Sequence, residues 1–326
     1  MALPVGAGES VIEVQWSGRA LGTTYAIRFV RDGSISLKDH ERGVSNLLER
    51  LEQQASTYRT NSELSLFNAS RQTNWFPVSK ELAEIVVEAQ RISALSDGAF
   101  DITVDPLVRL WGFGPQGHAG EIPSASAIHV AKAHVGFRNL EVITEPPALR
   151  KMDPELTIDL SAIAKGYCVD AVGRYLEQGG VTRYLVEIGG EVRARGLSAA
   201  NRPWHLGIEK PVDGVREIGT VVALADMSMA TSGDYRNSFV IGKKRYAHII
   251  DPKTGWPAAR NVASVSVVHS SCMTADAWAT ALSVMGAERG LVLAEQEGLA
   301  CLFVERNGEV IRPSSNASFE AVVVKK

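Results

Sequence analysis

The arrangement of apolar and polar residues along the first hundred positions predicts two strands followed by two helices. The strands are expected over 11–16 and 23–30. A helix is expected over 44–57, because apolar residues three and four positions apart form one stripe along it: Leu47, Leu48, Leu51 and Ala55. The next helix opens at Ser79, a residue type suited to capping a helix N-terminus, and ends near Gly98.

The middle of the chain changes character. Residues 100–123 are rich in Gly, Pro and Trp, which predicts a long irregular segment of the kind that often carries function. Thr157 to Leu160 are interpreted as a strand leading into a third helix, which begins near Ser161 and ends at the stop signal Gly179-Gly180.

The second half of the chain is dominated by short strands. They are predicted over 184–188, 192–196, 205–209, 221–226, 238–241, 246–250 and 262–268. Helices over 274–285 and 287–297 follow, then a hairpin over 299–311 that turns at Asn307-Gly308. Because strands and helices do not alternate regularly, the pattern favours an α+β fold with mixed or antiparallel sheets.

Charge and composition exclude several classes of protein. Lys and Arg number 34 against 37 Asp and Glu, a net charge of −3, so the chain lacks the basic excess of a nucleic-acid binder. No stretch reaches the roughly 20 apolar residues of a membrane helix. The three cysteines, Cys168, Cys272 and Cys301, are odd in number and far apart, which argues against a disulfide framework and a thiolate zinc site.

Common catalytic motifs are absent or out of context. Residues 112–117 match G-x-G-x-x-G, but the following residues cannot open the helix that a dinucleotide fingerprint needs. A Gly-rich active-site or surface loop is the better interpretation. There is no P-loop, no H-E-x-x-H and no G-x-S-x-G in the sequence.

Two segments offer oxygen ligands and a phosphate site. Asp276 and Thr280 stand four residues apart on a predicted helix, so both could face one hard cation such as Mg²⁺. The alternative is that Thr274 caps the helix and Asp276 complements its dipole. Asp159 and Lys165 flank a helix start whose free N–H groups could bind phosphate. The alternative is that Asp159 or Ser161 caps the helix and Lys165 is a surface lysine.

A single histidine, His248, precedes a Pro-Gly turn near a strand end. A lone histidine is usually structural, but in this position it can serve as a base.

Eight short motifs occur in the order of one family. They are LGTTY at 21–25, STYR at 56–59, GAFD at 98–101, DLSAIAKG at 159–166, GGE at 189–191, TSGDY at 231–235, HIIDP at 248–252 and TAD at 274–276. With them the chain resembles the ApbE family of FAD:protein FMN transferases over nearly its whole length. The resemblance implies one α+β domain over 11–326, built from duplicated β-α-β-rich halves, after an N-terminal tail at 1–10.

The resemblance also implies a reaction and a site. The family transfers FMN from FAD to a threonine hydroxyl of an acceptor protein, releases AMP and requires Mg²⁺. Carried over by motif, the metal ligands are Ala162 through its carbonyl, Asp276 and Thr280. The residues expected to contact FAD are Leu21, Tyr58, Ala99, Phe100, Asp101, Asp159, Lys165, His248 and Ile250. His248 is the expected general base.

Some positions depart from the family pattern. Leu21 stands where Met is usual, and Glu187 and Glu191 stand where Asn and Asp are commoner, so the two glutamates receive no direct role. The rival functions are a Mg²⁺-dependent FAD pyrophosphatase and a flavin-binding module without turnover.

The resemblance further implies an acceptor flavoprotein subunit of a respiratory or electron-transfer complex, which could bring the protein close to a membrane. The expected location is the periplasm, with the tail at 1–10 left after removal of an export signal and the cytoplasm as second choice.

Overall fold

The computed structural model describes residues 12–31, 37–115, 117, 120–211, 217–234, 238–242, 244–258, 261–308 and 310–325. The predicted tail at 1–10 therefore lies outside the described residues. No helix among the described residues is long and apolar enough to cross a membrane.

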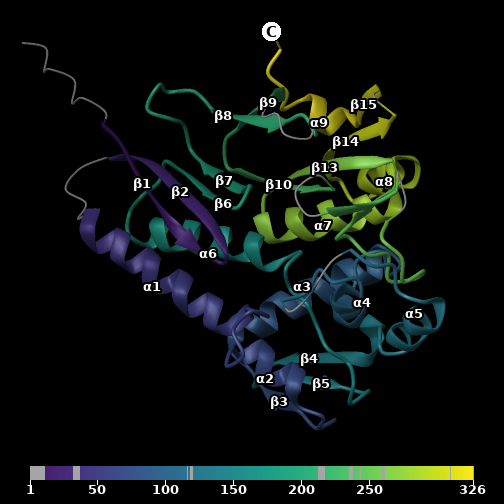
Figure 1. The fold of residues 1–326 in the computed structure, drawn as a ribbon. Helices are drawn as coiled ribbons and strands as arrows, with labels where there is room; N and C mark the ends of the chain where they lie inside the picture. The colour runs from purple at the N-terminus through teal and green to yellow at the C-terminus, as the bar shows by residue number, and fades with distance from the viewer. Residues whose placement is uncertain are drawn as a thin grey trace, which may run out of the picture.

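An eight-stranded sheet forms the upper part of the molecule in Figure 1. In spatial order its strands are β1 (Ile12–Ala20), β2 (Thr23–Arg31), β6 (Tyr184–Ile188), β7 (Glu191–Arg195), β10 (Met227–Gly233), β13 (Val262–His269), β14 (Ala300–Asn307) and β15 (Val310–Ser315). All the pairings between these strands are antiparallel. Central strand β13 is buried along almost its whole length, because both faces of the sheet are covered.

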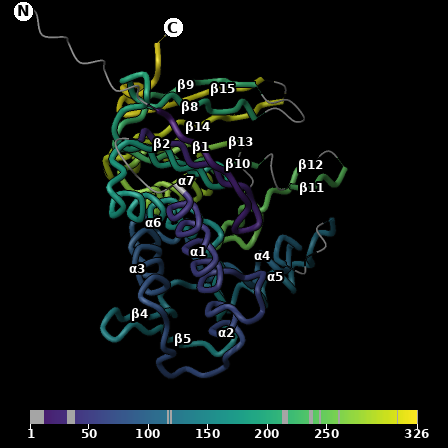
Figure 2. The backbone as a smooth tube through the Cα atoms, turned by 90° about the vertical axis from the view of Figure 1, so that its left-hand side faces the viewer, coloured from purple at the N-terminus to yellow at the C-terminus, as the bar shows by residue number. Residues whose placement is uncertain are grey.

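Four helices make the main core against one face of this sheet. They are α1 (Leu37–Ala55), α3 (Lys80–Leu95), α6 (Ala164–Gln178) and α7 (Cys272–Met285). Figure 2 shows α6 and α7 directly beneath the strands, with α3 below them. The other face is covered by β8 (Trp204–Glu209), β9 (Ile218–Leu224) and α9 (Ala317–Glu320). Helix α8 (Ala287–Gln296) packs on α7 and β14.

The lower part of the molecule consists of smaller elements. Strands β3 (Phe76–Pro77), β5 (Pro147–Lys151) and β4 (Leu140–Thr144) form an antiparallel sheet near α2 (Glu63–Ala69) and η2 (Phe137–Asn139). Beside it, η1 (Ile102–Val104), α4 (Asp105–Leu110) and α5 (Ala125–Lys132) face the hairpin of β11 (Ser238–Ile241) and β12 (Lys244–Ala247). A separate apolar cluster of Leu107, Trp111, Ile128, Tyr246 and Ile250 joins these pieces.

Helix α7 is buried on nearly all sides and is rich in alanine. Small side chains allow it to lie close to both the sheet and its neighbouring helices, since packed interiors leave little free space. Its N-cap is Ser271, whose Oγ accepts from the N–H of Thr274. The sequence interpretation of Thr274 as the cap is therefore wrong, and Thr274 instead donates to Glu88 Oε1 across 2.7 Å.

The expected α+β class with antiparallel sheets is confirmed, and several predicted elements match closely. Strands β6 and β11 and the cap at Ser79 are as predicted. Three expectations are wrong: α4 lies inside the segment expected to be irregular, 157–160 is not a strand, and α6 begins at Ala164. Strand β10 was not predicted, because its apolar residues are interrupted by Ser and Thr.

Candidate active site

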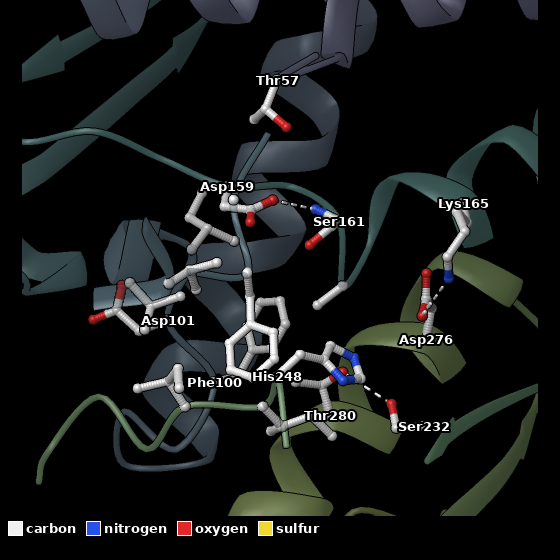
Figure 3. Close-up of a pocket in the computed structure, with 18 of the residues that line it drawn as sticks. Thr57, Phe100, Asp101, Asp159, Ser161, Lys165, Ser232, His248, Asp276 and Thr280 are labelled. Atoms are coloured by element: carbon white, nitrogen blue, oxygen red, sulfur yellow. Dashed lines mark hydrogen bonds and ion pairs between the residues drawn. The ribbon is translucent and has the colours of Figure 1, made fainter. Parts of the chain in front are cut away.

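A cavity of about 320 Å³ opens between the sheet and the lower part of the molecule. This size is typical of small-molecule sites. All of the predicted site residues except Leu21 line it, and Figure 3 shows labelled side chains from α6, α7 and the loops facing one another across it. The fold thus brings residues from Tyr58 to Thr280 into one place.

Leu21 lies elsewhere. It occupies the turn between β1 and β2 with a φ of 54° and packs against the main core. Its N–H donates to Glu52 Oε2 across 3.4 Å. Tyr58, by contrast, lines the cavity and is 71% exposed, so its ring stands at the mouth, where it is free to contact a ligand.

The starts of α6 and α7 are joined at the base of the cavity. The N–H of Gly166 donates to Asp276 Oδ2 across 3.0 Å. A Cβ at Gly166 would lie 2.4 Å from the carbonyl oxygen of Cys272, so only glycine permits this approach. The close contact fixes Asp276 against the free N–H groups at the helix start.

Lys165 stands between two carboxylates. Its Nζ lies 2.8 Å from Glu191 Oε1 and 3.8 Å from Asp276 Oδ1. Burial by itself would lower the pKa of Lys165, but the charges of Asp276 and Glu191 outweigh burial and raise it. Lys165 therefore stays protonated and can neutralise a phosphate.

Burial raises the pKa of both carboxyl groups, against the opposing effect of Lys165. Glu191 Oε2 is buried without a hydrogen-bond partner among the described residues. A buried polar atom of this kind costs free energy unless a ligand or cation satisfies it. Glu191, given no role from the sequence, is thus a residue of the site.

Asp101 holds the loop at one side of the cavity. Its Oδ1 accepts from the N–H and hydroxyl of Thr103, across 2.8 and 2.6 Å, and its Oδ2 accepts from the N–H of Phe137 across 2.8 Å. Burial nevertheless raises the pKa of this carboxyl group. Both oxygens shape the wall formed by Ala99 and Phe100.

Asp159 lies on a loop of the cavity wall, where its Oδ1 accepts from the N–H of Ser161 across 2.8 Å. Burial, with a smaller effect from Asp105, raises its pKa. The alternative interpretation of Asp159 as the helix cap is wrong, because α6 begins at Ala164 and has no side-chain cap; the bond instead holds the turn before the helix. The alternative for Lys165, a surface lysine, is wrong because its charge is held by Glu191 and Asp276.

The residues expected to hold Mg²⁺ all line the cavity: Ala162, Asp276 and Thr280. Thr280 Oγ1 lies 3.0 Å from Ser232 Oγ. No group of three or more His, Cys, Asp or Glu that could hold a metal occurs in the described part of the chain. The set of one carboxylate, one hydroxyl and one carbonyl nevertheless suits a hard cation that keeps several waters.

His248 also lines the cavity, and its position depends on a stack of aromatic rings. Its ring centroid lies 6.3 Å from that of Phe113. Phe113 stacks on Phe239 at 5.5 Å, Phe239 on Tyr246 at 5.4 Å, and Tyr246 on Trp111 at 5.7 Å. The Gly-rich loop predicted near 112–117 is therefore part of the active-site wall, through Phe113, Gly114 and Pro115.

Several lining residues were missed from the sequence: Thr57, Ser161, Thr231, Ser232 and Gly233, besides Glu191. A signal existed, because all lie within the eight motifs. These residues do not form a recognisable ligand pattern along the sequence, however, so only the tertiary contacts show that they line the cavity.

The chain is similar to known flavin transferases over nearly its whole length. The FAD:protein FMN transferase of Vibrio cholerae is 41% identical over 100% of this chain and 97% of its own length. The FAD:protein FMN transferase of Escherichia coli is 36% identical over 95% of this chain and 89% of its own length. The solved flavin transferase ApbE from Vibrio cholerae superposes with a TM-score of 0.88 at 40% identity, over 96% and 99% of the two chains.

The apo flavinyl transferase ApbE from Pseudomonas stutzeri gives a TM-score of 0.89 at 38% identity, over 97% of this chain and 98% of that one. Fold, site and similarity together define the protein as a transferase. The profile of the ApbE family matches residues 21–303, and the chain belongs to that family.

Proposed function

We propose that this protein transfers FMN from FAD to a threonine hydroxyl of an acceptor protein, with release of AMP. One observation carries the proposal: the cavity brings together the ammonium group of Lys165, the carboxylate of Asp276 and the imidazole of His248. Phosphoryl transfer needs positioning and charge neutralisation more than covalent chemistry, and these groups supply both.

The cavity residues have separate tasks in this reaction. Lys165, kept charged by Glu191 and Asp276, faces the pyrophosphate of FAD. His248 accepts the proton of the acceptor hydroxyl as its oxygen bonds to the FMN phosphorus. The bond from that phosphorus to the bridging oxygen breaks, and the electron pair leaves with AMP.

Asp276, Thr280 and the carbonyl of Ala162 are the residues that would hold Mg²⁺. Their all-oxygen chemistry and the unsatisfied Oε2 of Glu191 support a cation near them. When bound, Mg²⁺ supplies neutralisation of the charge on the pyrophosphate. The ring of Tyr58 at the cavity mouth would pack against the flavin or adenine ring.

The test combines the protein with FAD, Mg²⁺ and candidate acceptor subunits. We expect the acceptor band on a denaturing gel to fluoresce because flavin is covalently attached to it, and we expect one AMP to be released for each flavin attached. Both signals should be lost when EDTA is added. Mass spectrometry of the band then gives the modified residue, expected to be threonine. Equal AMP release without any acceptor would instead identify an FAD pyrophosphatase, and no AMP in either case would indicate a flavin-binding module.

We further propose that the acceptors are subunits of respiratory or electron-transfer complexes and that the reaction takes place in the periplasm. The support is the similarity to enzymes called FAD:protein FMN transferases, a name that includes a protein acceptor. Cell fractionation with an antibody to the protein, together with a search for flavinylated subunits in a deletion strain, tests both points. Recovery of the protein in the cytoplasmic fraction would reject the location.

A further inference from the structure

One edge of β10 is open where this strand reaches the cavity. β7 pairs with β10 only at Met227, Ser228 and Met229, whereas β10 continues to Gly233. The chain before β7 turns away at Gly189-Gly190, both with positive φ. The N–H of Gly190 is used by Glu187 Oε1 across 2.7 Å, so it does not pair with β10.

The hydrogen-bond pattern shows which backbone groups this edge presents. The N–H of Asp234 donates to the carbonyl of Ala263 across 3.0 Å, on the side of β13. In an antiparallel pair, successive residues of a strand point their backbone N–H and C=O groups to alternate sides. Ser232 therefore also bonds toward β13, and the N–H and C=O groups of Thr231 and Gly233 point to the opposite side. The 2.8 Å approach of the Thr231 and Ser266 hydroxyls fits a non-hydrogen-bonded pair.

These outward groups remain available within the cavity. Among the residues that the structure describes, none bonds to the outward N–H or C=O groups of Thr231 and Gly233. Both residues are half-buried and line the cavity. Ser232, between them, contacts Thr280, and Figure 3 shows Ser232 beside Thr280 and His248. The open edge therefore lies next to the reacting groups.

We propose that this edge binds an extended segment of the acceptor protein as an added strand. The proposal rests on the transferase function above. A phosphate would satisfy N–H donors but not carbonyl groups, whereas a peptide strand satisfies donors and acceptors that alternate along an edge. The added segment pairs with β10 beyond the point where β7 stops pairing. The hydrogen bonds to β10 fix the register of the segment and hold its target hydroxyl near His248.

The backbone is tested by two variants at one position. Thr231→Pro removes the outward N–H, and proline is tolerated at an open edge because no inward hydrogen bond is lost. Thr231→Val keeps the N–H and removes only the hydroxyl, so it is the matched control. FAD binding, followed by quenching of flavin fluorescence, and thermal unfolding report whether each variant retains the site and fold.

We expect both variants to bind FAD, and we expect the KM for the acceptor to be about tenfold or more higher in Thr231→Pro than in Thr231→Val. A KM unchanged in a folded Thr231→Pro protein would overturn the proposal. The acceptor used is the unmodified form of the subunit that becomes flavinylated in the assay above.

Hydrogen exchange in the unsubstituted protein gives a second result that does not depend on folding of the variant. The amides of Thr231 and Gly233 should gain protection when the acceptor is added and should not gain it with FAD and Mg²⁺ alone. Protection by FAD alone would show that the nucleotide occupies the edge and would reject the proposal. If the unsubstituted protein forms no flavin adduct at all, the transferase function itself fails, and the proposal fails with it.

Discussion

The backbone N–H of Gly166 donates to Oδ2 of Asp276 across 3.0 Å, and this bond connects the first turn of α6 with α7. It orients the carboxylate that faces Lys165 and the cavity. The bond is formed because Gly166 has no side chain to separate the two helices. The geometry of the site therefore depends on helix packing as much as on the residues that contact a ligand.

Gly166→Ala should lower the free energy of unfolding by about 1–3 kcal/mol, since the added methyl overlaps the backbone of Cys272 and the helices must separate. Urea denaturation measures the change. Gly179→Ala, at the C-terminal end of α6, is the control, because its Cβ meets only the movable end of His40. Equal midpoints for the two variants would contradict the close-packing argument.

Asp276→Asn should reduce transfer about 100-fold or more and weaken Mn²⁺ binding in parallel, because a neutral amide is a poor ligand for a hard cation. Calorimetric titration with Mn²⁺ measures binding apart from activity. Ser283→Ala on the same helix removes a hydroxyl that bonds to the carbonyl of Ala279 and should change neither quantity. Undiminished metal affinity in Asp276→Asn would remove Asp276 from the metal site.

Lys165→Met should destabilise the protein by about 2 kcal/mol, because Glu191 and Asp276 lose the cation between them. Adding Glu191→Gln should recover part of this stability without restoring FAD affinity. Chemical denaturation and fluorescence titration with FAD measure the two effects separately. Recovery of FAD affinity in the double variant would mean that Lys165 serves only to balance charge within the protein.

His248→Gln should slow transfer about 100-fold or more while FAD affinity changes little, since a general base acts on the acceptor hydroxyl rather than on the bound nucleotide. Single-turnover rates with preloaded FAD measure the chemical step. A loss of FAD binding of similar size would make His248 a nucleotide ligand and not the base.

Glu88 predicts a pH dependence of stability. Burial acts to raise its pKa, but hydrogen bonds from Arg91 and Thr274 outweigh burial and hold the pKa below its ordinary value of 4.5. Because the folded-state pKa is depressed, the stabilisation is present above pH 4.5 and is lost as the pH falls through the folded value.

Glu88→Gln should therefore cost about 1–2 kcal/mol at pH 7 and progressively less below pH 4.5. Denaturation of both proteins across this range measures the difference. A constant difference at every pH would indicate a packing effect instead of the charged hydrogen bonds.

The sequence by itself determined the class of fold and most of the site. Local signals are enough for elements such as the helix after Ser79 and the hairpin at Asn307-Gly308, because capping and turn chemistry act between near neighbours. The ordered motifs indicated Asp276, Thr280 and Lys165 together, because the resemblance to one family carries its site onto these positions.

The tertiary structure alone decided the role of Glu191, the aromatic support of His248 and the open edge of β10. Glu191 acquires a role because Lys165 lies 2.8 Å away, although Glu191 is 26 positions farther along the chain. The edge exists because β7 stops pairing before β10 ends. Such features depend on distances between remote segments, which spacing along the chain does not encode.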